Sequence, residues 1–235
     1  MEQRIEGLVR ILREGDDAAK FAAARELCNH AHGKRASKAA IAEAGGIPPL
    51  VELLRDGCAE AKWSAALALS VLASANDANR VLIVEADGIP RLLELLRDGS
   101  VEGKRSAARV LCHLTSNDAA RVAIAEAGGI PLLVDLLRSG NTPLSAAAAL
   151  RYLAHNNDAN AVAIALAVGL EALVELARGG EVIVDDRPVV CHAGLPAKRK
   201  AALVVAALIR DCVPVKVRNQ TWVRYLIRSV IGPYL

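Results

Sequence analysis

The chain has 235 residues, of which 53% are hydrophobic, 23% are charged and only 3% are aromatic. Disorder requires low hydrophobicity, so this composition excludes an intrinsically disordered chain and favours a folded one. The net charge of +3 is uneven, because the stretch from residue 181 onward holds nine Lys and Arg against four Asp and Glu. No uncharged run approaches the roughly 20 residues of a membrane-spanning helix, and the N-terminal segment is charged throughout. We therefore expect neither a membrane span nor a secretory signal.

Five cysteines are scattered along the chain, at Cys28, Cys58, Cys112, Cys191 and Cys212. Their odd number and the lack of CxxC pairs indicate reduced thiols rather than a disulfide framework. We therefore expect a cytoplasmic or nuclear protein.

One short motif recurs along the chain. It is IEGLVRILREG at Ile5–Gly15, EAGGIPPLVELLRDG at Glu43–Gly57 and EADGIPRLLELLRDG at Glu85–Gly99. It returns as EAGGIPLLVDLLRSG at Glu126–Gly140 and, in a more divergent form, as LAVGLEALVELARGG at Leu166–Gly180. The copies follow one another at a nearly constant interval. A period of about 40 residues indicates a solenoid of stacked helices.

Each repeat is expected to contain three helices separated by short breaks. In the second repeat a short helix ends near Ala42, where Gly45 and Gly46 terminate it, and Pro48 opens a leucine-rich helix that stops at Gly57. Glycine reaches the left-handed conformation at a helix C-terminus, and proline fits the first helical turn. The third helix is rich in alanine, which lets neighbouring copies approach closely.

The third helices of the first four repeats are AKFAAARELCNHAH, AKWSAALALSVLAS, GKRSAARVLCHLTS and LSAAAALRYLAH. The polar pairs Asn76–Asp77, Asn117–Asp118 and Asn157–Asp158 follow the last three. We expect the Asp of each pair to cap the first helix of the next repeat. Lys34–Arg35 stands at this place after the first repeat, so the cap is expected to be missing there, with Ser37 as the candidate substitute.

The fifth repeat is interrupted by an insertion, residues 181–197, between its second and third helices. Glu181–Val184 and Val189–Val190 are predicted to form a small hairpin turned at Asp185–Asp186. Within the C-terminal segment 212–235, Trp222, Leu226, Val230 and Ile231 stand at helical spacing. They predict a closing helix over Asn219–Ile231, which would cover the open end of the solenoid.

The three-helix unit, the Gly-Gly-Ile-Pro break and the alanine-rich third helix with its polar joint resemble the armadillo repeat. HEAT repeats are two-helix units and lack the Gly-Ile-Pro break. The segments EAGGIPPLVELLRDG and SAALALSVLAS are similar to the armadillo arrays of plants and algae, some of which are fused to a U-box. No such box is present in this sequence, so ubiquitin-ligase activity is not carried over.

The resemblance implies a right-handed all-α solenoid, an armadillo superhelix, in a single domain over residues 1–235. The expected repeats are 1–34, 35–76, 77–117, 118–157 and 158–211, with the insertion at 181–197 and a C-terminal cap at 212–235. It also implies a protein-interaction scaffold or adaptor whose third helices line a concave groove for a partner segment. No enzymatic activity, cofactor or metal is implied.

Residues one helical turn apart on the third helices are expected to line up along this groove. The candidate contact residues are Arg25, Asn29, Trp63, Leu67, Val71, Arg105, Arg109, His113, Asn117, Tyr152 and Asn156. Guanidinium groups offer forked donors to carboxylates and phosphates, so Arg25, Arg105 and Arg109 favour an acidic or phosphorylated partner segment.

For two of these residues the sequence leaves two interpretations open. Trp63 is either an interface anchor or a plug between repeats, as Phe21 would be one repeat earlier. His113 is either a partner contact or an ordinary surface histidine.

The import-receptor branch of the family carries a Trp and, four residues later, an Asn on successive third helices. Arg25, Leu67 and Arg109 stand at the first three Trp positions, and only Asn29 matches at the Asn positions. This pattern argues against a nuclear-import receptor.

The insertion holds residue types that serve catalysis, Cys191–His192 and Asp185–Asp186. Adjacent residues on an extended segment point to opposite faces, and a second pair of zinc ligands is missing, so we expect neither an enzyme nor a metal site. Two other functions stay open. One is a structural subunit that uses residues 181–197 and the basic C-terminus. The other is a weak binder of nucleic acid or anionic surfaces through the C-terminal Lys and Arg residues.

Overall fold

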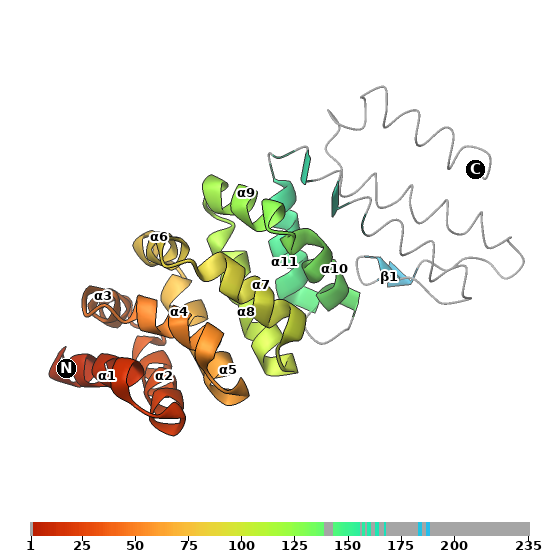
Figure 1. Cartoon of the computed structure of the whole chain (residues 1–235). Helices are drawn as coiled ribbons and strands as arrows, with labels where there is room; N and C mark the ends of the chain where they lie inside the picture. The colour runs from red at the N-terminus through yellow and green to blue at the C-terminus, as the bar shows by residue number, and fades with distance from the viewer. Residues whose placement is uncertain are drawn as a thin grey trace, which may run out of the picture. The chain divides into compact units, whose positions relative to one another are not determined.

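The structure is a computed structural model, shown in Figure 1, and it describes residues 2–138, 143–155, 157, 159–160, 163–164, 167, 183–184 and 187–188. The chain divides into two compact units, Met1–Tyr152 and Leu153–Leu235. Nearly all of the described residues belong to the first unit. Asn156, Cys191–His192, most of the expected fifth repeat and the expected cap at 212–235 lie outside the described residues.

The first unit is a stack of helices, as the sequence predicts for an α-solenoid (Figure 1). The helices are α1 (Glu2–Glu14), α2 (Asp17–Ala31), α3 (Arg35–Glu43), α4 (Ile47–Asp56), α5 (Ala59–Ala73), α6 (Asp77–Glu85), α7 (Gly88–Asp98), α8 (Val101–Leu114), α9 (Asp118–Glu126), α10 (Gly129–Arg138) and α11 (Pro143–Ala154). In the repeat, α1, α4, α7 and α10 are second helices, and α2, α5, α8 and α11 are third helices.

The core lies between consecutive repeats. Helix α5 packs between α2 and α8, while α7 contacts both α4 and α10. The second helices supply leucines, such as Leu50 and Leu92, which are fully buried. The third helices meet through alanines, such as Ala24, Ala66 and Ala108, which are also fully buried. Small side chains let these helices approach closely, so the exposed positions of adjacent third helices are brought near one another.

The breaks before the second helices follow the predicted glycine chemistry. Gly45 and Gly128 adopt the left-handed conformation, with φ of +71° and +78°. Asp87 occupies the same position in the third repeat and adopts it too, with φ of +63°. Aspartate tolerates this region better than most residues because its short polar side chain bonds locally, but glycine adopts it without steric cost.

The residues that cap the first helices are the asparagines, and the prediction that the aspartates do so was wrong. The side-chain oxygen of Asn76 accepts from the Asn79 amide at 3.1 Å, and that of Asn117 accepts from the Ala120 amide at 3.1 Å. Asp77 is already the first residue of α6, where its negative charge interacts favourably with the positive N-terminal end of the helix dipole. At the start of α3, Lys34 makes no side-chain capping hydrogen bond, as expected.

The insertion contains a short antiparallel pair, β1 (Ile183–Val184) and β2 (Arg187–Pro188). Val184 lies opposite Arg187, and Ile183 lies opposite Pro188. The hairpin is therefore present, but its second strand begins at Arg187, ahead of the predicted Val189. Among the helices that the structure describes, none has the length and apolar character needed to cross a membrane.

Candidate functional site

Most of the predicted contact residues lie on α2, α5 and α8. We call the surface of these helices that is formed by Phe21, Arg25, Asn29, Trp63, Leu67, Arg105, Arg109 and His113 the third-helix face. Arg25 and Asn29 on α2 are exposed, and so are Arg105 and Arg109 on α8. Trp63, Leu67 and His113 are half-buried, and Tyr152 on α11 is 38% exposed. Two residues differ in character: Val71 is only 8% exposed and belongs to the core, and Asn117 is exposed but serves as a helix cap.

An aromatic pair joins the first two third helices. The ring of Phe21 on α2 lies 6.3 Å from the ring of Trp63 on α5, with a tilt of 37°. The guanidinium of Arg25 lies 5.4 Å from the centre of the Phe21 ring, within the range of a cation–π interaction. Both aromatic residues are half-buried, so each packs against a neighbour and still presents surface to solvent. Trp63 thus fills space between repeats without being removed from the third-helix face.

Positively charged side chains cluster on the part of this face formed by α8. Arg105 and Arg109 lie one helical turn apart on α8, with His113 one turn further. Burial lowers the pKa of His113, and the positive charges of Arg109, Arg80 and Lys38 lower it further. Cations from three helices, α8, α6 and α3, therefore act on the His113 imidazole.

Two of those cations are held by backbone oxygens at the C-terminal end of α5. The Lys38 ammonium donates to the Ser74 oxygen at 2.6 Å, and the Arg80 guanidinium donates to the Ala73 oxygen at 3.1 Å. Arg80 also forms an ion pair with Asp77. Cations suit this place because the last carbonyls of a helix have no partner within it and carry the negative end of the dipole.

The sequence contains a signal for these cations that motif analysis missed. Lys38, Arg80 and Arg121 recur once in each of three successive repeats, always at the fourth position of a first helix. The sequence indicated Phe21 only as a plug between repeats, so this residue was missing from the predicted contact residues. The Arg151 guanidinium lies 4.3 Å from the centre of the Tyr152 ring on the same helix.

The cysteines of the third helices are packing residues. Cys28 is buried and Cys112 is half-buried. Burial raises the pKa of both thiols, against smaller opposite effects of Arg109 on Cys28 and of Arg151 on Cys112. A raised pKa keeps a thiol protonated and unreactive. No group of three or more His, Cys, Asp or Glu in the described part of the chain is arranged to hold a metal ion.

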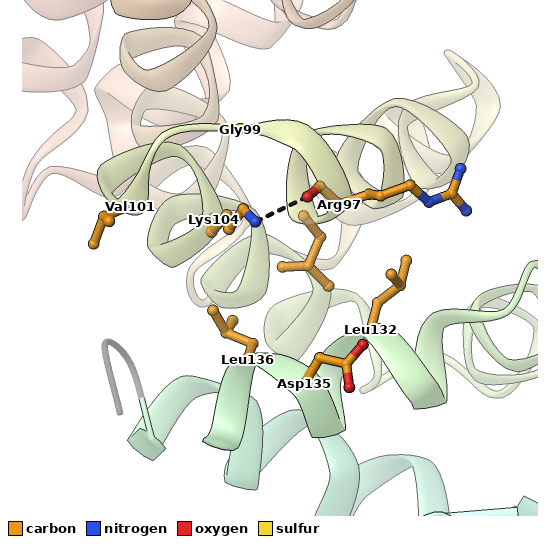
Figure 2. A pocket seen from close by; sticks show the side chains of 8 residues that line it. Arg97, Gly99, Val101, Lys104, Leu132, Asp135 and Leu136 are labelled. Atoms are coloured by element: carbon orange, nitrogen blue, oxygen red, sulfur yellow. Dashed lines mark hydrogen bonds between the residues drawn. The ribbon is translucent and has the colours of Figure 1, made fainter. Parts of the chain in front are cut away.

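A separate pocket of about 280 Å³ lies at the other edge of the stack, between α7, α8 and α10. Figure 2 shows its lining, including Lys104, whose ammonium donates to the Arg97 backbone oxygen at 2.8 Å. A smaller pocket of about 80 Å³ occupies the equivalent place two repeats earlier and includes Arg13 and Lys20. Because the same pocket recurs at equivalent positions, we attribute it to the packing of repeats rather than to a specific ligand.

Comparison with known proteins identifies the repeat. The family model for the armadillo/beta-catenin-like repeat matches residues 76–116 and 117–155. A crystal structure of an engineered protein from the Northeast Structural Genomics Consortium is 30% identical, with a TM-score of 0.68 over 98% of this chain and 96% of that one. The chain belongs to the armadillo repeat family.

Two further armadillo structures resemble the chain. A designed armadillo repeat protein in complex with the peptide (KR)4 is 26% identical, with a TM-score of 0.66 over 87% of this chain and 81% of that one. Computationally designed armadillo repeat proteins for modular peptide recognition are 24% identical, with a TM-score of 0.71 over 98% of this chain and 90% of that one. The latter likeness bears on the fold alone. Among curated proteins, none matches the sequence.

Armadillo membership places the chain among protein-binding repeat scaffolds, and the armadillo fold is typically non-catalytic. The third-helix face is the surface of this armadillo array on which the predicted contact residues gather. Its chemistry changes from one repeat to the next, because α5 contributes Trp63 and Leu67 while α8 contributes Arg105, Arg109 and His113.

Proposed function

We propose that this armadillo array is a scaffold or adaptor that binds an extended, acidic or phosphorylated segment of a partner protein along its third-helix face. The observation that carries the proposal is the state of Arg109. Its side chain is exposed and forms no ion pair with any carboxylate in the part of the chain that the structure describes. A guanidinium in this state is available to a carboxylate or phosphate from a partner.

The surrounding charges support an anionic partner. Arg105 is exposed one turn from Arg109, and Arg25 is exposed two repeats earlier. The described part of the third-helix face, as made up by α2, α5 and α8, places no Asp or Glu at the aligned positions beside them. A segment with negative charges would gain long-range attraction as well as local hydrogen bonds.

The (KR)4 complex gives a useful contrast. That designed armadillo protein is bound to a peptide of alternating lysine and arginine. The present chain has Arg25 and Arg109 on its third helices, and these side chains would repel such a peptide. We therefore propose the same kind of binding surface with the opposite charge preference.

A pair of peptides tests the proposal. Fluorescein-labelled (DE)4 and (KR)4 are titrated with the protein, and binding is measured by fluorescence polarisation at two salt concentrations. We expect (DE)4 to bind at least about tenfold more tightly, with an affinity that falls as salt screens the charges. Tighter binding of (KR)4, or equal binding of the two peptides, would contradict the proposal.

The residues are tested with a charge-reversed variant. Arg105→Glu with Arg109→Glu should abolish binding of (DE)4 while leaving the circular dichroism spectrum and melting temperature unchanged. The matched control is Arg10→Glu with Arg97→Glu, which reverses two exposed arginines on α1 and α7, outside the third-helix face. Equal loss in both variants would show a response to net charge alone and would remove the third-helix face from the proposal.

A further inference from the structure

The third-helix face has two chemically different halves. Its first half, on α2 and α5, presents the half-buried rings of Phe21 and Trp63 together with Leu67. Its second half, on α8, presents Arg105, Arg109 and His113. The two halves are adjacent because α5 and α8 pack directly against each other.

The first half has the properties of an apolar anchor site. Phe21 and Trp63 contact each other across the first two repeats, so their rings form one surface rather than two isolated spots. Arg25 lies over Phe21 and borders this surface with a charge. Half-buried aromatic rings supply large contact area at little entropic cost, which is why they often dominate binding energy at interfaces. A large apolar side chain would cover the exposed parts of both rings.

The second half has the properties of an anion site with a fixed positive background. Lys38 and Arg80 donate hydrogen bonds to the carbonyls of Ser74 and Ala73, and their positive charges act on His113. The Arg80 charge is partly offset by Asp77, but Asp77 itself is almost fully exposed. Arg109 adds an exposed guanidinium on the surface. A carboxylate or phosphate here would meet donors from Arg109 and the combined field of three cations.

Building on the proposed function, we propose that the array recognises a two-part segment, in which a large apolar side chain binds at Phe21 and Trp63 and an acidic or phosphorylated residue binds at Arg109 and His113. Adjacent packed helices are about 10 Å apart, and an extended chain rises about 3.3 Å per residue. Side chains of an extended chain alternate between its two faces, so the two groups should be about two or four residues apart.

Four short peptides of equal length in a Gly-Ser background test this inference by fluorescence polarisation. The first carries Trp and, four positions away, two consecutive Asp residues. The second replaces Trp by Ser, the third replaces both Asp by Asn, and the fourth doubles the spacing between the two groups. Each arrangement is also made in the reversed order, so that either chain direction is sampled.

We expect the first peptide, in one of its two orders, to bind about tenfold or more tightly than the other three. Trp63→Ala should reduce its affinity to that of the peptide without Trp, and Arg109→Glu should reduce it to that of the peptide without Asp. Val122→Ala, at an exposed apolar position on α9, is the matched control and should change nothing.

The outcomes separate the inference from the proposed function. If peptides with and without Trp bind equally and both depend on Arg109, acidic-segment binding stands and the two-part inference is wrong. If the peptide with doubled spacing binds as well as the first, the two sites act independently and the inference is also wrong. If no peptide binds, including (DE)4, the proposed function fails and the inference fails with it.

Discussion

The ammonium of Lys38 donates a hydrogen bond to the backbone oxygen of Ser74 at 2.6 Å, linking the first helix of the second repeat to the end of that repeat's third helix. Lys38 is 9% exposed, and the bond is partly buried. Burial lowers the pKa of Lys38, and nearby Arg35 lowers it further. The bond connects α3 to the C-terminal end of α5 and places a charge beside the third-helix face.

Lys38→Met should destabilise the protein by about 1–2 kcal/mol, because it keeps most of the side-chain volume but leaves the Ser74 carbonyl without its charged donor. The measurement is urea denaturation followed by circular dichroism. Lys34→Met is the control, since Lys34 is exposed and makes no side-chain cap, and it should change stability by less than about 0.5 kcal/mol. Equal changes of stability in the two variants would show that the hydrogen bond from Lys38 does not stabilise the fold.

Asn79 on α6 bonds to residues of α3 and α5, so its replacement should lower the free energy of unfolding more than replacement of Lys38 does. Its side-chain amide donates to the Lys38 oxygen at 3.3 Å and to the Leu72 oxygen at 3.1 Å, and the residue is 1% exposed. Asn79→Ala should cost about 2–3 kcal/mol, because two buried carbonyls lose their donor at once. Asn29→Ala, at an exposed site on α2, should leave the denaturation midpoint nearly unchanged. A loss at Asn79 no larger than the loss at Asn29 would show that water replaces the bridge.

Substitutions at the two left-handed positions Gly128 and Asp87, which precede second helices, should change stability in opposite directions. Gly128→Ala should destabilise by about 1 kcal/mol, and the cause is conformational because an added Cβ would meet nothing within 4 Å. Asp87→Gly should raise stability by up to about 1 kcal/mol, since the exposed carboxylate contributes only a long ion pair with Arg91 at 3.7 Å. Thermal unfolding of both variants measures the pair. The same sign for both changes would contradict the conformational explanation.

Because the pKa of His113 is lowered in the folded protein, stability should depend on pH. Its folded pKa lies below the ordinary value of about 6.5, so below that pH the unfolded chain binds more protons than the folded chain. The contribution of His113 is therefore fully present above pH about 6.5 and is lost as the pH falls from there towards the lowered pKa. The free energy of unfolding of the wild type should fall more steeply between pH 7.5 and 5 than that of His113→Asn. Parallel curves for the two proteins would contradict the prediction.

Over the helices that the structure describes, α1 to α11, the sequence was sufficient for the repeat pattern and for the approximate positions of the helices. Proline and glycine constrain the backbone locally, so the break at Gly45 and the helix that opens near Pro48 could be placed without coordinates. The capping residue could not be placed with the same certainty. Asn76 and Asp77 are both good caps, and which of them precedes the first helical turn differs by a single residue.

The candidate site was predicted less completely, because its character depends on contacts between helices. The sequence placed Trp63 and Phe21 on equivalent positions but left open whether they plug the stack or face a partner. The contact between the two rings and their partial exposure depend on the distance between α2 and α5, which the sequence does not give. Likewise, Val71 shares the spacing of its neighbours but is only 8% exposed and belongs to the core, and burial of a short side chain depends on the packing of adjacent helices.

The most direct test asks where an acidic segment lies on the protein. A (DE)4 peptide carrying a photoreactive benzophenone side chain is irradiated in complex with the chain, and the attachment points are mapped by mass spectrometry. The account predicts attachment on α5 and α8, near Leu67, Arg109 and His113, and its loss in the Arg105→Glu, Arg109→Glu variant. Attachment confined to the first helices α6 and α9, or to the pocket between α7 and α10, would contradict it.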